Sequence, residues 1–422
     1  MRSALPIIPA LALALSVPAL AAAPRTPEQV AAAALAAAPV FDGHNDVPEQ
    51  LRDRRGNVLA GFDFTDTATT ADPAKGVAAM QTDLKRLRQG HVGAQFWSVY
   101  VSANLPEPQA VQATLEQIDV TKRLVARYPA DMQLCTTAAC AAQAMKAGRI
   151  ASFMGMEGGH SIGGSLGVLR QMFELGARYM TLTHFKTISW ADAATDAPAH
   201  DGLTPFGVQV VKEMQRLGML VDLSHTSAAT MNDALDVAGA PVIFSHSGAL
   251  AINGSPRNVP DAVLARLAGN GGLVMVDAYP AYVNECVRQW NAARNAEEAR
   301  LKSLSPGSPA AAKGALADWD KANPMPRTRV GDVADHIDHV VKLAGIDHVG
   351  IGGDFDGIET TVEGMSDVAG YPALFTELAR RGYSQQDLEK LASGNILRVL
   401  RAGEAYAAAH RSDPPQESPV SF

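Results

Sequence analysis

The stretch Met219-Leu220-Val221-Asp222-Leu223-Ser224-His225 is a short apolar run that ends in a histidine, and Val242-Ile243-Phe244-Ser245-His246 repeats this layout. Both runs have the length and composition of buried strands. Six comparable runs lie at 40–44, 94–101, 150–157, 179–184, 273–279 and 348–354. Eight strands that alternate with helices predict an α/β fold, a (β/α)8 TIM-like barrel with its chemistry at the carboxyl ends of the strands.

Segments with the apolar spacing of helices separate these runs, and they would form the outer ring of the barrel. Thr226 and Ser227 can cap the helix that follows them, and Pro260-Asp261 can start another. One interruption, 287–329, is rich in Asn, Ala, Lys, Ser and Pro. We interpret it as a partly helical insertion that either covers the barrel mouth or forms an ordinary surface excursion. The predicted helices are 78–87, 166–175, 206–217, 228–237, 263–267 and 333–343.

The N-terminus has the layout of a cleavable signal peptide. Arg2 precedes an apolar stretch at 4–20, and the alanine-rich segment 19–23 follows at its end. We therefore expect a signal peptide at 1–21 with cleavage near 21–23, one barrel domain at 24–410, and a polar C-terminal tail at 411–422. These features predict export, into a bacterial periplasm, without a membrane anchor.

Charge and cysteine content limit the partners and the compartment. The formal charge is −8, and removal of Arg2 with the signal segment leaves 35 basic and 44 acidic side chains, or −9. No basic stripe interrupts this balance, so nucleic acid is not an expected partner. In an exported chain we expect Cys135 and Cys140 to form a disulfide and Cys286 to stay free. The alternative is three reduced cysteines.

Five side chains at the strand ends have the mixture of imidazole and carboxylate that binds zinc. His44 and Asp46 alternate along a strand and therefore face the same side. Glu157 can bridge two cations through its two oxygens, and His225 and His246 end neighbouring strands. Singly, each could be a hydrogen-bonded or ion-paired strand end. Together they predict a two-metal site in a barrel of the metal-dependent hydrolase type.

Short motifs surround these residues along the chain. They are Asp42-Gly43-His44-Asn45-Asp46, Glu157-Gly158-Gly159-His160-Ser161, Leu182-Thr183-His184, Trp190-Ala191-Asp192, Asp222-Leu223-Ser224-His225, Ser245-His246-Ser247, Arg257-Asn258-Val259 and Gly352-Gly353-Asp354-Phe355-Asp356-Gly357. In sequence and in order they resemble the motifs of the membrane dipeptidase family, also called renal dipeptidases, over about residues 38 to 400. The resemblance implies a zinc metallopeptidase that hydrolyses dipeptides, including those with a C-terminal D-residue. It also suggests a homodimer.

The resemblance also implies roles for individual residues. Two Zn2+ ions per chain would be held by His44, Asp46 and Glu157 and by Glu157, His225 and His246, with a metal-bridging hydroxide as the nucleophile. His184 would polarise the scissile carbonyl, and Asp354 would move a proton to the leaving nitrogen. Arg257 would bind the carboxylate of the substrate, with His184 and Tyr279 also contacting the substrate.

Two other functions remain open at this point. One is a related binuclear-metal amidohydrolase that acts on N-acyl amino acids or lactones, and the other is a non-catalytic periplasmic binding protein. The chain also departs from the family pattern. Glu49 follows Pro48 where members commonly have an aromatic residue, Cys286 lacks the partner of the animal disulfide, and 287–329 is longer than expected.

Overall fold

The structure is a computed structural model that describes residues 25–419. Its parallel strands close into a barrel because β2 pairs with β4 as well as with β1. The barrel is therefore a (β/α)8 TIM barrel, as predicted. Its strands are β1 (Val40–Asn45), β2 (Val92–Ser98), β4 (Ile150–Glu157), β5 (Ala177–Thr181), β6 (Leu220–Asp222), β7 (Ile243–Phe244), β8 (Leu273–Asp277) and β9 (Val349–Gly352).

A ninth strand, β3 (Met132–Leu134), was not predicted. It pairs with the first residues of β4, whereas β5 pairs with β4 from Met154 onward. Only Met132 of its three residues is buried, so β3 lacks the apolar run by which the barrel strands were recognised.

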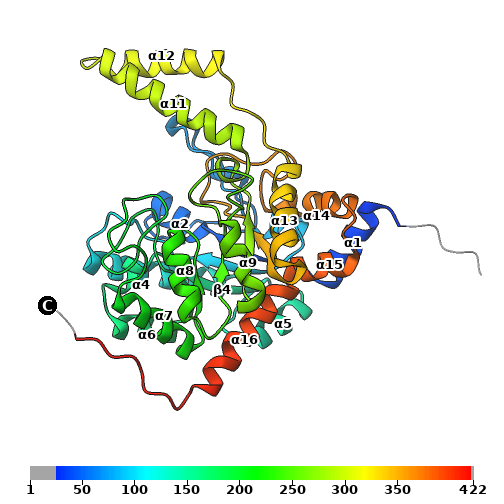
Figure 1. Cartoon of the computed structure of the whole chain (residues 1–422). Helices are drawn as coiled ribbons and strands as arrows, with labels where there is room; N and C mark the ends of the chain where they lie inside the picture. The colour runs from blue at the N-terminus through cyan, green and yellow to red at the C-terminus, as the bar shows by residue number, and fades with distance from the viewer. Residues whose placement is uncertain (1–24, 420–422) are drawn as a thin grey trace, which may run out of the picture.

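Helices between the strands form the outer ring (Figure 1). The predicted helix 78–87 is wrong at its start, because the side chain of Asp83 caps the backbone N–H of Arg86 at 2.8 Å and the helix begins at Leu84. The helices are α1 (Pro27–Ala37), α2 (Val47–Arg55), α3 (Leu84–Gln89), α4 (Glu107–Arg127), α5 (Ala138–Lys146), α6 (Leu166–Glu174), α7 (Pro205–Leu217), α8 (Ala228–Val237), α9 (Asp261–Asn270), α10 (Pro280–Val283), α11 (Glu285–Leu304), α12 (Pro309–Ala322), α13 (Val330–Ala344), α14 (Tyr371–Arg380), α15 (Gln385–Glu389) and α16 (Asn395–Ala409). None of these helices combines the length and apolar character needed to cross a bilayer.

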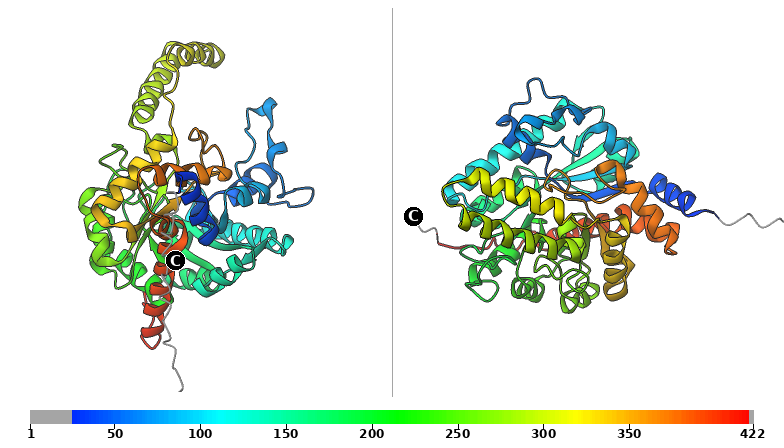
Figure 2. Two further views of the ribbon diagram at one scale, coloured as in Figure 1. Left: turned by 90° about the vertical axis from the view of Figure 1, so that its right-hand side faces the viewer. Right: turned by 90° about the horizontal axis from the view of Figure 1, so that it is seen from above.

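The segment 287–329 contains most of α11 and all of α12, which project from the barrel as a helical arm (Figures 1 and 2). The arm has a small core of its own, formed by Leu301, Ala312 and Leu316. Its residues do not line the pocket described below. The insertion therefore contributes no residue to the pocket wall in this structure.

Cys135 and Cys140 form a disulfide with a Cα–Cα distance of 5.5 Å, as predicted. The bond lies between β3 and the first turn of α5. Cys286 is free and exposed at the start of α11.

Buried carboxylates connect the strands just before the site. Asp222 accepts the backbone N–H of Ser245 at 2.8 Å and the hydroxyl of Thr181 at 2.5 Å, and so links β5, β6 and β7. Asp42 accepts the backbone N–H of Gly353 at 2.8 Å and links β1 to the end of β9. These bonds satisfy buried polar groups and bring the strand ends that carry the site residues into one arrangement.

Gly43 shows how closely the strand ends approach. A Cβ atom at this position would lie 2.4 Å from the carbonyl oxygen of Ser245 and 2.6 Å from the sulfur of Met275. Any side chain would therefore push β1 away from neighbouring backbone. The glycine before His44 allows that histidine to approach His246, whose ring centre lies 3.8 Å away.

Candidate active site

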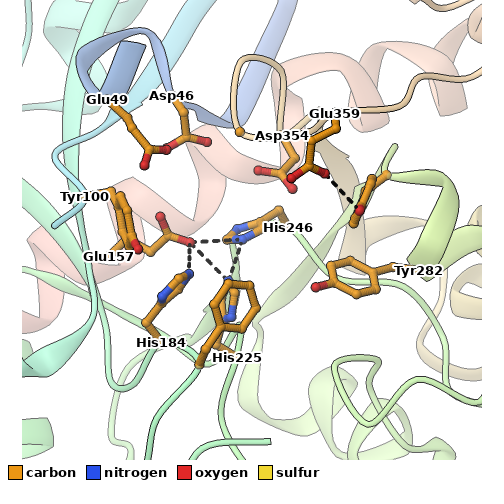
Figure 3. Close-up of a pocket in the computed structure, with 13 residues that line it drawn as sticks. Asp46, Glu49, Tyr100, Glu157, His184, His225, His246, Tyr282, Asp354 and Glu359 are labelled. Carbon is orange, nitrogen blue, oxygen red and sulfur yellow. Dashed lines mark hydrogen bonds and ion pairs between the residues drawn. The ribbon is translucent and has the colours of Figure 1, made fainter. Parts of the chain in front are cut away.

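The candidate site is a pocket of about 240 Å³ at the carboxyl ends of the barrel strands (Figure 3). This is where the eight predicted strands were expected to place their functional residues. Its lining residues are Asp46, Glu49, Tyr100, Glu157, His184, Phe185, His225, His246, Tyr279, Tyr282, Asp354, Gly357 and Glu359.

Glu157, the last residue of β4, lies between the histidines of this pocket (Figure 3). Its Oε1 lies 3.0 Å from Nε2 of His225 and 3.4 Å from Nε2 of His246. Its Oε2 lies 3.3 Å from Nε2 of His44. The two oxygens thus face different histidines, which is the geometry that a bridging carboxylate requires.

His225 and His246 follow the ends of β6 and β7, and their Nε2 atoms lie only 3.0 Å apart. The backbone of His225 has a φ of 66°, a left-handed conformation that is uncommon for a residue with a side chain. Non-glycine residues in this region cluster at functional sites. The strand ends early at this point, so that the turn can aim the imidazole at Glu157.

Hydrogen bonds on the other ring nitrogen orient two of the histidines. Nδ1 of His44 lies 2.8 Å from the hydroxyl of Tyr179, and Nδ1 of His246 lies 2.8 Å from Oγ of Ser245. Because Ser245 donates its hydroxyl proton to Asp222 at 2.6 Å, His246 must donate from Nδ1. Its Nε2 then keeps a lone pair for a cation. Such outer partners are typical of metal-binding histidines.

Tyr179, Ser245 and Asp222 were not predicted as site residues. Ser245 and Asp222 lie in the quoted strand runs and Tyr179 begins another, but a tyrosine, a serine and an aspartate inside apolar runs carry no spacing that predicts such a role. Only the closure of the barrel brings Tyr179 on β5 to His44 on β1.

His44 also faces two further carboxylates. Its Nε2 lies 3.3 Å from Oδ2 of Asp46 and 4.0 Å from Oδ1 of Asp354. Burial, together with the neighbouring carboxylate of Asp277, raises the pKa of Asp354 well above its usual range. Asp354 has a φ of 57°, so a second residue of the site has left-handed backbone.

The charge states follow from burial and from the neighbouring groups. Burial by itself would raise the pKa of Glu157, but His44 and His184 hold it well below its usual range. Burial lowers the pKa of His225 and of His246 well below the usual range, so both rings are neutral. A carboxylate and neutral imidazoles are the forms that bind divalent cations.

His184 lies against the same carboxylate, with Nε2 3.6 Å from Oε1 of Glu157. Its ring centre lies 4.7 Å from that of Tyr100 and 4.0 Å from that of Phe185. Burial between these aromatic rings lowers the pKa of His184 to about 4. A neutral imidazole at this place can donate one hydrogen bond to an oxygen in the pocket.

Arg257 is fully buried and is not among the pocket-lining residues. Its Nη2 donates to the carbonyl oxygen of His246 at 2.8 Å and its Nη1 to the hydroxyl of Ser247 at 2.9 Å. Its Cζ lies 5.6 Å from the ring centre of Tyr282, which does line the pocket. Nε has no hydrogen-bond partner among the described residues. The guanidinium is therefore next to the pocket wall but enclosed.

Two further acidic residues line the pocket. Glu359 accepts the hydroxyl of Tyr279 at 3.1 Å, so the predicted substrate-binding Tyr279 belongs to the wall. Glu49 lies beside Asp46 at the start of α2 (Figure 3). Burial, with the neighbouring carboxylate of Asp46, raises the pKa of Glu49 to about 8.

The site residues fit divalent cations. Nε2 of His44 and Oδ1 of Asp46 are buried without hydrogen-bond partners among the described residues. Nε2 of His225 faces Nε2 of His246, and two lone pairs that face each other cannot form a hydrogen bond. A cation between such atoms would satisfy them. Three clusters have donor atoms within metal-binding reach: His44, Glu157 and His246; Glu157, His184 and His225; His44, Asp46 and Asp354.

The sequence model of the membrane dipeptidase family, peptidase family M19, matches residues 28–414. The chain belongs to this family. It is a metal-dependent peptide hydrolase of the dipeptidase class, which agrees with the cluster of imidazoles and carboxylates in the pocket. The family resemblance carried by the strand-end motifs is thereby confirmed.

Solved structures share the barrel fold of this chain. The chain is similar to the probable dipeptidase PvdM from Pseudomonas aeruginosa, with 24% identity, a TM-score of 0.75, and coverage of 90% of this chain and 99% of that one. A metallopeptidase from Rhodobacter sphaeroides, liganded with a phosphinate mimic of the dipeptide L-Ala-D-Ala, has 24% identity, a TM-score of 0.70, and coverage of 87% and 99%. The metallopeptidase dipeptidase AC has 25% identity, a TM-score of 0.69, and coverage of 87% and 98%.

Proposed function

We propose that this membrane dipeptidase family member is a zinc enzyme that hydrolyses dipeptides, including those with a C-terminal D-residue. The observation that carries the proposal is the position of Glu157, whose Oε1 faces His225 and His246 and whose Oε2 faces His44. The L-Ala-D-Ala mimic bound by the Rhodobacter sphaeroides metallopeptidase supports the substrate class.

His44, Asp46 and Glu157 would hold one Zn2+, and Glu157, His225 and His246 the other. Bound by these residues, two cations would supply Lewis acidity and would lower the pKa of a nucleophilic water toward neutral pH. Five ligands of mixed imidazole and carboxylate character suit zinc. The orientation of His44 by Tyr179 and of His246 by Ser245 keeps the Nε2 lone pairs directed into the site.

His184 and Asp354 would assist the reaction from opposite sides of the pocket. Neutral His184 donates a hydrogen bond to the carbonyl oxygen as negative charge develops there, a type of contribution commonly of about 3 kcal/mol per donor. Asp354, whose pKa burial raises well above its usual range, can hold a proton and pass it to the departing nitrogen.

Arg257 and Tyr279 would recognise the C-terminal residue of the substrate. A guanidinium suits a carboxylate, and the unpaired Nε of Arg257 is a donor that a ligand could satisfy. Because Arg257 is enclosed in this structure, the pocket wall, of which Tyr282 is a part, would have to shift for the carboxylate to reach it. Longer peptides lack a free carboxylate at this position, which would restrict the enzyme to dipeptides.

A second candidate function is a binuclear-metal amidohydrolase that acts on N-acyl amino acids or lactones. The enclosure of Arg257 favours a substrate of this second class that has no carboxylate, since among residues 25–419 no Lys or Arg side chain lines the pocket. A lactone would need no cation there. Substrate panels separate the two functions.

We expect zinc-loaded protein to contain about two zinc ions per chain and to hydrolyse both L-Ala-L-Ala and L-Ala-D-Ala. Removal of metal with a chelator should abolish turnover, and added Zn2+ should restore it, because the nucleophile depends on the cations. Metal analysis and release of free alanine measure this. The amidohydrolase would be supported instead if the protein binds two zinc ions and hydrolyses N-acetyl-alanine or a lactone but hydrolyses neither dipeptide.

Tyr179→Phe should weaken zinc binding by about 10- to 100-fold, because His44 loses the oxygen that accepts its Nδ1 proton. Competition with a chromophoric chelator measures the affinity. Tyr371→Phe is the matched control, since it removes a buried hydroxyl that donates to Asp42 at 2.6 Å and contacts no proposed ligand. Equal zinc affinities for the two variants would show that Tyr179 does not orient His44.

We also propose export to a periplasm and assembly as a homodimer. The predicted signal peptide lies outside the described residues. Both proposals rest on the sequence, the first on the layout of residues 1–23 and the second on the family resemblance.

A further inference from the structure

The pocket contains more carboxyl groups than the proposed reaction uses. Five carboxylates line it, whereas among the described residues no Lys or Arg does. Asp46 and Glu157 are assigned to metal and Asp354 to proton transfer. Glu49 and Glu359 have no assigned role, and the one ion pair between them and an Arg or Lys among the described residues is that of Glu49 with Arg52. A cation on the substrate would balance either carboxylate.

Glu49 is positioned to receive a ligand. Its Oε1 lies 3.3 Å from Nη2 of Arg52, but Arg52 also donates to Asp53 at 2.9 Å and to the carbonyl oxygen of Tyr100 at 2.6 Å. Arg52 is thus shared among three acceptors and lies outside the pocket lining. Oε2 of Glu49 has no hydrogen bond from the described residues and remains available to a donor on a substrate.

Glu359 differs from Glu49 in its surroundings. It accepts a hydrogen bond from Tyr279 and lies near Tyr282, across the pocket from Glu49 and Tyr100 (Figure 3). The proposed recognition of the substrate carboxylate involves Arg257, which contacts Tyr282. If the C-terminal residue of a dipeptide lies on that side, its N-terminal residue lies beside Glu49.

A substrate could offer Glu49 either its α-amino group or a cationic group on its N-terminal side chain. The distance between Glu49 and the reacting atoms favours one of the two. The scissile carbonyl must lie beside Glu157 and His184, and the α-amino group is attached one carbon away. The side chain of Glu49 is 23% exposed, compared with 6% for Glu157 and 4% for Asp46, so Glu49 lies farther out along the wall. A long side chain spans this distance more easily than an α-amino group.

We propose that Glu49 selects dipeptides whose N-terminal residue has a cationic side chain, such as lysine, ornithine or arginine. The ammonium or guanidinium group binds Oε2 of Glu49, and the methylene groups of the side chain pack against the ring of Tyr100. This inference rests on the proposed dipeptidase function and assigns its substrate class.

The test compares kcat/KM for Lys-Ala with that for norleucyl-Ala, which has a side chain of similar length without the charge. In zinc-loaded wild type we expect Lys-Ala to be favoured by about 10-fold, the value of a charge-assisted hydrogen bond. Glu49→Gln should bring the ratio close to one, and Glu49→Asp should retain part of it. Glu359→Gln, on the opposite wall, and Glu116→Gln, exposed on α4, should keep the wild-type ratio.

Each other outcome is decisive. A wild-type ratio near one, or a ratio that Glu49→Gln leaves unchanged, would overturn the inference. Equal losses for both substrates in Glu49→Gln would assign Glu49 to the α-ammonium group that the substrates share, and would also overturn it. If the zinc-loaded wild type hydrolyses L-Ala-D-Ala without any preference for Lys-Ala, only this inference fails. If it hydrolyses no dipeptide, the proposed function fails as well.

Discussion

Glu157→Gln should lose bound zinc and reduce dipeptide hydrolysis by at least about 100-fold. Removal of an outer partner of a metal ligand already costs about 10- to 100-fold, and Glu157 would contact both cations. The amide also places an N–H2 group where a carboxylate oxygen now faces histidines at 3.0 to 3.4 Å. Zinc content per chain and kcat/KM for L-Ala-D-Ala measure the effect.

The matched control for this variant is Glu213→Gln. Glu213 is also fully buried, but it accepts hydrogen bonds from Arg170 at 2.9 Å and Arg216 at 2.8 Å, on α7 and away from the pocket. Its loss should lower the melting temperature and leave zinc content intact. If Glu157→Gln retains two zinc ions and turnover, the bridging assignment is wrong.

Arg257→Met should lower kcat/KM for L-Ala-D-Ala by at least about 30-fold. Loss of one partner from a desolvated charged pair costs about 2–5 kcal/mol, and here that pair would be the guanidinium and the substrate carboxylate. The loss should be much smaller for the corresponding dipeptide amide, which has no carboxylate to bind. Steady-state kinetics with both substrates give the comparison.

The structure allows a different outcome for Arg257, because its two terminal nitrogens donate to Ser247 and to the carbonyl oxygen of His246. If the variant loses activity equally toward the acid and the amide, Arg257 positions His246 and does not bind the carboxylate. Arg178→Met is the matched control for loss of a guanidinium, since Arg178 donates to three backbone carbonyls and does not line the pocket. It should leave the ratio of the two rates unchanged.

The barrel could be predicted from the sequence because its strands are buried on both faces and appear as apolar runs. Every predicted run overlaps a barrel strand, and five of the six helical segments overlap a helix with which they agree in position. The exceptions have local causes. Asp83 caps α3, so this helix begins at Leu84 and not at the predicted residue 78. β3 is too short and too exposed to appear as an apolar run in the sequence.

The candidate site could be predicted for a similar reason. The carboxyl ends of parallel strands meet at one end of a barrel, so His44, Glu157, His225 and His246 had to converge once eight strands were recognised. The spacing of residues does not show which oxygen of Glu157 faces which histidine, or that the backbone of His225 is left-handed. Both depend on atomic positions in the folded barrel.

By itself, the sequence determined the barrel, the dipeptidase family and the cluster of metal-capable residues, because periodicity and residue type are local properties of the chain. Only the tertiary structure decided the environment of each group. It enclosed Arg257 behind the pocket wall, placed Tyr179 against His44, and left Glu49 facing the pocket with one oxygen free. Burial and hydrogen bonding depend on contacts between segments far apart in the chain, and those contacts exist only after the barrel has closed.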